Sequence, residues 1–285
     1  MLLASCGNKN NSYDASGTFE STEIIVSSQA TGQLMQFNVN EGDTLHANQP
    51  VGYVDSTQFH LTKLQLVENQ KAILAGRPDV KSQIDATQKQ IDNIMLEQQR
   101  VSNLVKANVA SQKQLDDVNS KLAVLQAQLA AQKSSLNNST STINQQGVAV
   151  EAQLTQVNDQ LKKCVIVNPI DGTVLTTYAN PSEVTTTGKP LYKIANLSTV
   201  ELRAYVTGDQ FANVKLGQKV KVLVDESKDK YRNYDGVVDW ISNKAEFTPK
   251  TIQTKDERAN LVYAIKIKVK NDGFIKLGMY GEVKF

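Results

Sequence analysis

The sequence has few aromatic residues, no long apolar run and no excess of charge of either sign. Aromatic side chains make up 6% of the chain, and no apolar run approaches the roughly 18 residues that a membrane-spanning helix needs. The 31 basic side chains nearly balance the 29 acidic ones, for a net charge of +2, so there is no electrostatic case for binding nucleic acid. The middle of the chain is rich in Gln, Asn, Ser, Ala and Leu. That composition fits long solvated helices better than a globular enzyme.

Motifs of catalysis, metal binding and cofactor binding are also missing from the sequence. The two histidines, His46 and His60, have no metal-ligand spacing around them. There is no Walker loop, dinucleotide fingerprint, nucleophile elbow or zinc motif. The adjacent carboxylates Asp116 and Asp117 stand at the start of a predicted helix, where negative charge favours the helix dipole. We therefore expect a protein that is not an enzyme, with no catalytic, metal-binding or cofactor-binding residues.

Apolar residues with heptad spacing predict an α-helical hairpin over residues 57–164. The core positions of the first helix hold mostly isoleucine and valine, with two polar residues in the remaining slots: Ile84, Thr87, Ile91, Ile94, Gln98, Val101 and Val105. Those of the second helix hold mostly leucine and valine: Leu115, Val118, Leu122, Leu125, Leu129, Leu136, Ile143, Val150, Leu154, Val157 and Leu161. A period of about 3.5 residues marks the narrow seam of a coiled coil.

Breaks in this pattern locate the ends of the helices. The Gly-Arg-Pro sequence at 76–78 should kink or restart the first helix, because proline lacks an N–H and clashes with the preceding turn. The polar stretch 137–140 is the matching weak point in the second helix. The turn between the arms is predicted at 106–110, where Asn108 suits a helix end, and Ser111 with Gln114 forms a capping box. The tip of the hairpin therefore lies near 106–111.

The segments on either side of the hairpin look like two halves of one β-domain, over residues 20–56 and 165–197. Gly32 and Pro50 have the same separation as Gly172 and Pro190. Apolar residues follow each proline at matching positions: Val51 and Val54 in the first half, Leu191 and Ile194 in the second. A repeat that is split by a long insertion requires the two helices to leave the domain together and to return to it. This geometry favours a device for reaching a partner over a catalyst.

The C-terminal segment, 198–285, is predicted to form a β-barrel. The runs 220–224, 236–242 and 261–269 resemble strands, and turn residues and charges separate them. In the last run, Ile265 and Ile267 alternate with Lys266 and Lys268, which places the lysines on the solvent side of one strand. We expect this row to be a solvated face that also discourages pairing at an edge.

The N-terminus, residues 1–19, is predicted to be a flexible tether. Leu3-Ala4-Ser5-Cys6 resembles the lipobox of bacterial lipoproteins, in which the cysteine is acylated. Five residues precede Cys6, fewer than a signal peptide has, so either the true start lies upstream or the match is accidental. The second cysteine, Cys164, closes the second helix at a core position and is expected to be buried and inert. A Cys6–Cys164 disulfide is the weaker alternative.

Several motifs, spread over nearly the whole chain, resemble the periplasmic adaptors, also called membrane fusion proteins. Arg100, Leu104 and Ser111 match the hairpin-tip pattern of that family in residue type and spacing. The stretches 30–32 with 39–43, and 168–174, are similar to its two lipoyl-like half-domains, although Asn168 stands where the family usually has alanine. The stretch 194–206 is similar to its entry into the β-barrel. The stretch 245–263 is similar to hemolysin-secretion-type adaptors, a branch often associated with ABC exporters.

This resemblance implies an α+β, elongated modular adaptor with a split lipoyl-like β-domain, an inserted antiparallel coiled-coil hairpin and a C-terminal β-barrel. It implies that Arg100, Leu104 and Ser111 dock on a TolC-like outer-membrane channel. It also implies an inner-membrane exporter as partner, with the ABC type favoured, and self-association into a hexameric ring. The expected location is the periplasmic side of the inner membrane of a Gram-negative bacterium, with a lipid anchor at Cys6.

Other interpretations remain open at this point. Taken singly, Ser111 is a helix cap, Leu104 can pack across the turn, and Arg100 can be a solvated charge. The whole chain could be a structural coiled-coil spacer of the cell envelope without a role in transport. A lipoyl or biotinyl carrier would need a lysine at an exposed β-bend, and neither 40–43 nor 180–183 contains one.

Overall fold

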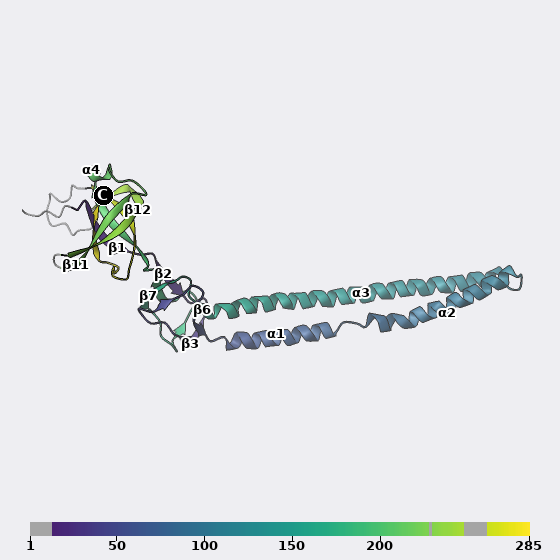
Figure 1. Ribbon diagram of the computed structural model, residues 1–285. Coiled ribbons are helices and arrows are strands. Elements are labelled where there is room, and N and C mark those ends of the chain that lie inside the picture. The colour runs from purple at the N-terminus through teal and green to yellow at the C-terminus, as the bar shows by residue number, and fades with distance from the viewer. Residues whose placement is uncertain (1–12, 228–229, 248–260) are drawn as a thin grey trace, which may run out of the picture. The chain divides into compact units, whose positions relative to one another are not determined.

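The computed structural model describes residues 13–227, 230–247 and 261–285. These residues divide into two compact units. Ser56–Lys163 is helical, and the segments that precede and follow it consist of β-strands and one short helix (Figure 1). The predicted combination of a helical hairpin with β-domains is confirmed.

Three helices form the hairpin: α1 (Thr57–Ala75), α2 (Val80–Lys106) and α3 (Gln112–Lys163). α1 and α2 follow each other along the first arm, and both pack against α3, the return arm (Figure 1). The break between α1 and α2 falls at the predicted Gly-Arg-Pro sequence. α2 then begins at a new cap, where the Asp79 carboxylate accepts a hydrogen bond from the Ser82 N–H at 3.1 Å. Hydrogen bonds from the hydroxyl and amide of Ser82 lower the pKa of Asp79.

Predicted heptad positions of 84–94 and 122–129 form a buried seam between α2 and α3. Ile91, Leu122 and Leu129 are its buried cluster, and Ile84, Ile94 and Leu125 pack against them. Thr87 takes one polar slot: its hydroxyl lies 3.1 Å from Oε1 of Gln132, and Nε2 of Gln132 donates to the Gln83 carbonyl at 2.7 Å. Because each of these polar groups finds its partner on the facing helix, the polar slots favour one register of the two arms.

α3 runs without interruption through residues 137–140, so the weak point predicted there is wrong. Polar residues in this stretch do not remove a backbone donor as proline does. The hydroxyls of Thr140 and Thr142 instead donate to the carbonyls of Leu136 and Asn138, at 2.8 and 2.9 Å. Serine and threonine in a helix commonly form this bond to the preceding turn, and it leaves the helix continuous.

A glycine allows α3 to approach α1 closely. A Cβ atom at Gly147 would lie 2.8 Å from Cδ2 of Leu74. The Gly147 carbonyl also accepts a hydrogen bond from Nε2 of Gln70 at 3.2 Å. The arms are therefore in contact beyond the break as well as near the tip.

The two predicted halves form two four-stranded sheets. The first half contributes β2 (Glu23–Ser27), β3 (Gly32–Phe37), β4 (Thr44–Leu45) and β5 (Pro50–Val54). The second contributes β6 (Val165–Val167), β7 (Gly172–Thr177), β8 (Val184–Thr185) and β9 (Pro190–Ala195). The strand orders are β2-β9-β7-β4 and β6-β5-β3-β8. Each sheet takes two strands from each half, so neither half completes a sheet alone.

Equivalent hydrogen bonds relate the two halves. The N–H of Gly42 donates to the Val174 carbonyl at 2.9 Å, and the N–H of Ser182 donates to the Leu34 carbonyl at 2.7 Å. Gly42 and Ser182 occupy the same place in their bends, and both have a positive φ, 90° and 71°. The buried apolar residues come from both halves: Leu34, Phe37, Val51, Val54, Val174, Leu191, Tyr192 and Ile194. The internal repeat read from the sequence is therefore a structural repeat.

Six antiparallel strands close the barrel. Their order around it is β1 (Ala15–Glu20), β10 (Thr199–Thr207), β13 (Leu261–Lys270), β12 (Lys230–Phe247), β11 (Lys219–Ser227) and β14 (Tyr280–Lys284). The short helix α4 (Gly208–Phe211) follows β10 and lies at one end of the barrel (Figure 1). Alternate apolar residues of the strands fill the interior, among them Leu202, Val222, Ile265 and Ile267.

Two expectations for the barrel need correction. Part of the segment assigned to a tether, 1–19, forms β1 and pairs with β10 and β14, so the barrel is not confined to 198–285. β13 alternates as predicted, but β10 and β12 flank it on both sides, so its lysines protect no edge. Nζ of Lys266 instead lies 3.0 Å from a carboxylate oxygen of Glu20 and 2.8 Å from one of Glu201.

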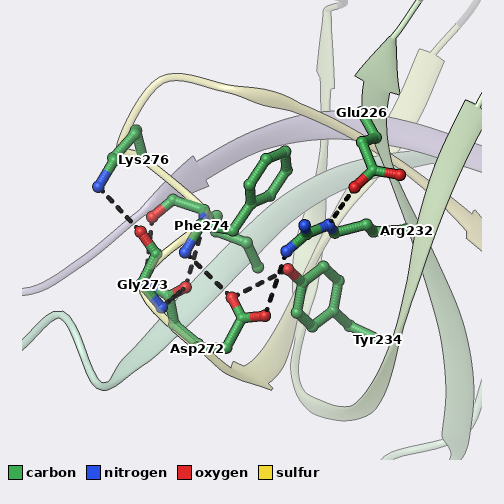
Figure 2. A network of polar contacts seen from close by, with 9 residues as sticks. Glu226, Arg232, Tyr234, Asp272, Gly273, Phe274 and Lys276 are labelled. Carbon is green, nitrogen blue, oxygen red and sulfur yellow. Dashed lines mark hydrogen bonds and ion pairs between the residues drawn. The ribbon is translucent and has the colours of Figure 1, made fainter.

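A polar network ties the β13–β14 connection to strands β11 and β12 (Figure 2). Nε of Arg232 on β12 donates to Glu226 on β11 at 2.7 Å, and its guanidinium lies 4.2 Å from the ring centre of Phe274. Asp272, in the β13–β14 connection, accepts a hydrogen bond from the Tyr234 hydroxyl at 3.0 Å. The Arg232 pKa is raised, first by its bond to Glu226. The network holds the β13–β14 connection against β12.

Candidate docking site at the hairpin tip

The hairpin tip is a hydrogen-bonded turn with a defined conformation. At the end of α2, the N–H of Asn108 donates to the Val105 carbonyl at 3.0 Å, and the N–H of Val109 donates to the Leu104 carbonyl at 2.8 Å. This pair of bonds is the Schellman motif, which satisfies carbonyls that a helix end otherwise leaves free. Asn108 supplies the left-handed residue that the motif needs, with φ of 60°, and asparagine tolerates this conformation better than most residues.

The predicted capping box opens α3. Oε1 of Gln114 accepts a hydrogen bond from the Ser111 N–H at 2.9 Å, and the Ser111 hydroxyl accepts from the Gln114 N–H at 3.4 Å. The structure therefore gives Ser111 a structural role as a helix cap. Its side chain is nonetheless exposed, so capping leaves it accessible to a partner.

Two apolar side chains are exposed at the tip. Leu104 keeps 39% of its surface accessible and Val109 keeps 74%. Packing across the turn therefore accounts for only part of the Leu104 side chain. Val109 is absent from the set of docking residues predicted from the sequence. The signal that could have found it is the presence of valine, the largest apolar side chain in the predicted turn 106–110.

Arg100 lies one helical turn before Leu104, so the two residues share a face of α2. Its guanidinium is 2.9 Å from a carboxylate oxygen of Glu97; the Arg100 side chain is 71% exposed and that of Glu97 is 40% exposed. An exposed ion pair of this kind contributes little to stability. Arg100 can therefore exchange Glu97 for an acceptor on a partner at small cost.

Of the two cysteines, Cys6 lies outside the described residues. Cys164 directly follows α3, is buried and carries a free thiol. Burial, reinforced by the nearby Asp55 carboxylate, raises the pKa of Cys164. A protonated, buried thiol is a poor nucleophile, as expected for a packing residue.

Residues 13–227, 230–247 and 261–285 contain no group of three or more metal-binding side chains. Nδ1 of His46 is 3.3 Å from Asp171, at an exposed contact between the two β-halves, and His60 lies in α1. The hairpin carries a groove of about 430 Å³ lined by Ile94, Ser120, Lys121, Val124 and Leu125. Lys121 is the one titratable side chain in this lining, so the groove lacks the converging polar groups of an enzyme site.

Within the described part of the chain, no helix is both long enough and apolar enough to cross a membrane.

Comparisons with known proteins extend over nearly the whole chain, although no family model matches it. A protein from Yersinia pseudotuberculosis serotype O:3 (strain YPIII) described as a UPF0194 membrane protein is 28% identical over 296 residues, covering 94% of this chain and 88% of the relative. The UPF0194 membrane protein YbhG of Salmonella arizonae is 27% identical over 291 residues, covering 94% and 87%. These relatives are membrane proteins by description.

Two solved structures share the fold. MacA from Actinobacillus actinomycetemcomitans has a TM-score of 0.56 at 20% identity, over 97% of this chain and 79% of MacA. Spr0693 from Streptococcus pneumoniae R6, described as a membrane fusion protein, has a TM-score of 0.53 at 18% identity, over 94% of this chain and 96% of Spr0693. At these identities the likeness concerns the fold.

Proposed function

We propose that this chain, whose fold is that of the membrane fusion proteins it resembles in sequence, is a non-enzymatic periplasmic adaptor in a multipartite export system. It bridges an inner-membrane exporter of the ABC type to a TolC-like outer-membrane channel. The partner transporter supplies the energy, and the adaptor supplies reach and a docking surface.

The observation that carries this proposal is the construction of the tip. Leu104 and Val109 expose apolar side chains to solvent at the tip of the helical hairpin. The Schellman hydrogen bonds fix the conformation of the backbone that carries them. Ordering a surface before it binds reduces the entropy that binding costs. Arg100 and Ser111 add an exchangeable charge and an accessible hydroxyl beside the apolar pair. This combination suits a partner made of helix ends, which offers apolar grooves and free carbonyl groups.

The remaining parts of the proposal concern assembly and location. A lipid anchor at Cys6 holds the adaptor on the periplasmic side of the inner membrane of a Gram-negative bacterium. Six copies form a ring around the export path. The descriptions of the sequence relatives as membrane proteins support a membrane location, and the fold shared with Spr0693, a membrane fusion protein, supports a bridging role.

The spacer and carrier alternatives make different demands on the chain. A carrier presents a lysine at an exposed bend, whereas the bends here hold Gly42 and Ser182 with positive φ and contain no lysine. A spacer needs two stable arms, but it does not need exposed apolar side chains at the tip. Leu104 and Val109 therefore favour a docking function over both alternatives.

Substitution of Leu104 by Asp tests the proposal, because a charge at this position opposes apolar docking without disturbing the Schellman bonds, which involve backbone atoms. Val124→Asp is the matched control, since Val124 is exposed on α3 away from the tip. We expect Leu104→Asp to abolish efflux and crosslinking from position 106 to the channel at normal protein levels, and Val124→Asp to retain both. Unchanged efflux and crosslinking in Leu104→Asp would favour the spacer.

A further inference from the structure

The antiparallel arrangement of the barrel strands determines which strand ends lie together at each rim. Because neighbouring strands run in opposite directions, the starts of β1, β13 and β11 meet the ends of β10, β12 and β14 at the same rim. The N-terminal segment enters the barrel there, and the α4 connection between β10 and β11 lies there too. We call this the entry rim. The strand ends that continue into the split β-domain, Glu20 and Thr199, lie at the other rim.

The entry rim exposes three large apolar side chains from three separate segments. Tyr13 precedes β1, Leu216 lies between α4 and β11, and Leu261 begins β13. Leu216 is 69% accessible, and the other two are about half exposed. They are single side chains spaced around a rim. A specific protein interface instead buries a contiguous patch of about 800 Å² on each partner.

The loop that carries Leu216 is held firmly. Gly217, with φ of 78°, donates from its N–H to the Val238 carbonyl at 2.8 Å, and the N–H of Val238 donates to the Gln218 carbonyl at 2.9 Å. The side chain of Gln218 accepts from the Lys215 N–H at 2.9 Å. These bonds order the backbone on both sides of Leu216, so its exposure is a property of the folded loop and does not come from a frayed end.

Lysines flank the exposed leucine. Lys215 and Lys219 lie on either side of it in the chain, and Lys284 ends β14 at the same rim; all three side chains are exposed. Acids lie nearby as well. Asp209 is exposed in α4, Asp239 is exposed directly after Val238, and Asp14 accepts a hydrogen bond from the Phe285 N–H at 2.9 Å. Lys219 also helps to lower the pKa of Asp235, after the larger effect of Lys221. Neither Lys215 nor Lys219 forms an ion pair with another described residue, so both ammonium groups remain available to an anionic partner.

We propose that the entry rim rests on an anionic lipid surface, with Leu216 inserted at the membrane interface and Lys215 and Lys219 facing lipid phosphates. Scattered apolar and aromatic tips with lysines between them are typical of surfaces that lie on a bilayer. Each lysine near an anionic surface adds attraction. The rim thus supplies a membrane contact that is distinct from a lipid anchor.

The position of Cys6 in the chain supports a lipid surface as the partner of the entry rim. This support rests on the proposed function, in which Cys6 is acylated. Tyr13 is the seventh residue after Cys6, and at about 3.6 Å per residue this stretch of chain spans at most about 25 Å. An acylated Cys6 therefore keeps the entry rim close to the membrane surface. At that distance even a weak contact is formed often, because the tether raises its effective concentration.

The first test uses the full chain with Cys6→Ser, so that no acyl chain contributes. Its co-sedimentation is measured with vesicles of phosphatidylethanolamine and phosphatidylglycerol (3:1) and with phosphatidylcholine vesicles. We expect binding to the anionic vesicles that falls with added salt. Leu216→Ser should weaken it about five- to tenfold, and Lys215→Gln with Lys219→Gln should weaken it roughly tenfold or more. Leu64→Ser, at an exposed leucine of α1, is the matched control and should leave binding unchanged.

A second measurement reports insertion directly. The chain has one tryptophan, Trp240, so Leu216→Trp in a Trp240→Phe background places a single reporter in the loop. Vesicles with brominated acyl chains should quench it, and a Leu64→Trp reporter in the same background should stay unquenched. Equal binding of the Leu216→Ser and parent proteins, or an unquenched reporter at 216, overturns the proposal. So does loss of exporter crosslinking in Leu216→Ser with vesicle binding intact, which would make the rim a protein contact. None of these results depends on docking at the tip, which the Leu104→Asp experiment tests separately.

Discussion

The hydroxyl of Tyr192 donates a hydrogen bond to Oδ1 of Asn168 across 3.0 Å, and both residues are completely buried. The amide nitrogen of Asn168 donates in turn to the carbonyls of His46 and Ile170, at 2.8 and 2.6 Å. Asn168 belongs to the second β-half and His46 to the first. The pair therefore joins the two halves that the hairpin insertion separates in the sequence.

Substitution of Tyr192 by Phe should lower the free energy of unfolding by about 1–2 kcal/mol, because it leaves Oδ1 of Asn168 without this donor in a buried site. Chemical denaturation followed by circular dichroism measures the change. Tyr280→Phe is the matched control, since Tyr280 is strongly exposed and its hydroxyl is free to bind water. Equal stability of the two variants would show that the buried bond contributes nothing net.

The same tyrosine predicts a dependence on alkaline pH. Burial raises the pKa of Tyr192 from 10.0 to about 12. Above pH 10 the unfolded chain releases the Tyr192 proton while the folded chain keeps it. The free energy of unfolding therefore falls as the pH rises from about 10 to about 12. Ultraviolet titration should show a late tyrosinate component in the native protein that Tyr192→Phe removes. A profile identical in both proteins would contradict the assignment.

Thr185 offers the opposite case, a buried polar group whose removal should help. Its hydroxyl is buried and has no hydrogen-bond partner among the described residues, and the equivalent position in the first half holds Leu45, also buried. Thr185→Val keeps the shape and removes the unsatisfied group, so we expect the free energy of unfolding to rise by about 1 kcal/mol or more. Thr44→Val, on the neighbouring exposed position of β4, should change it little. Destabilisation by Thr185→Val would imply a partner for this hydroxyl.

The heptad seam, the helix cap at the tip and the β-repeat could be predicted from the sequence, and the structure contains all three. The heptads require only that Ile91, Leu122 and Leu129 share a seam, and the capping box at Ser111 involves residues three apart. The β-repeat was visible because both halves carry the same glycine and proline separation. Each signal can be recognised within a single segment of the chain, so the sequence pattern alone reveals it.

Features that depend on contacts distant in the sequence were missed. Ala15–Glu20 became a barrel strand because β10 and β14, both much later in the chain, pair with it on either side. The lysines of β13 resemble edge protection in the sequence, but β10 and β12 pair with this strand on both sides. At the tip, the spacing of Arg100, Leu104 and Ser111 was visible in the sequence. The exposure of Val109 was not, because it depends on the left-handed conformation of Asn108, which apolar periodicity does not predict.

Asn108 therefore provides a sharp test of the tip. A β-branched residue is strained at positive φ, so Asn108→Val should cost about 1–2 kcal/mol locally and disturb the bonds that present Leu104 and Val109. Asn108→Gly is the matched control, because glycine adopts this conformation freely. We expect efflux and crosslinking from position 106 to the channel to fall strongly in Asn108→Val and to persist in Asn108→Gly, with circular dichroism showing both hairpins folded. If the two variants dock equally well, the conformation of the turn is irrelevant to docking, and the partner recognises only the side chains along α2.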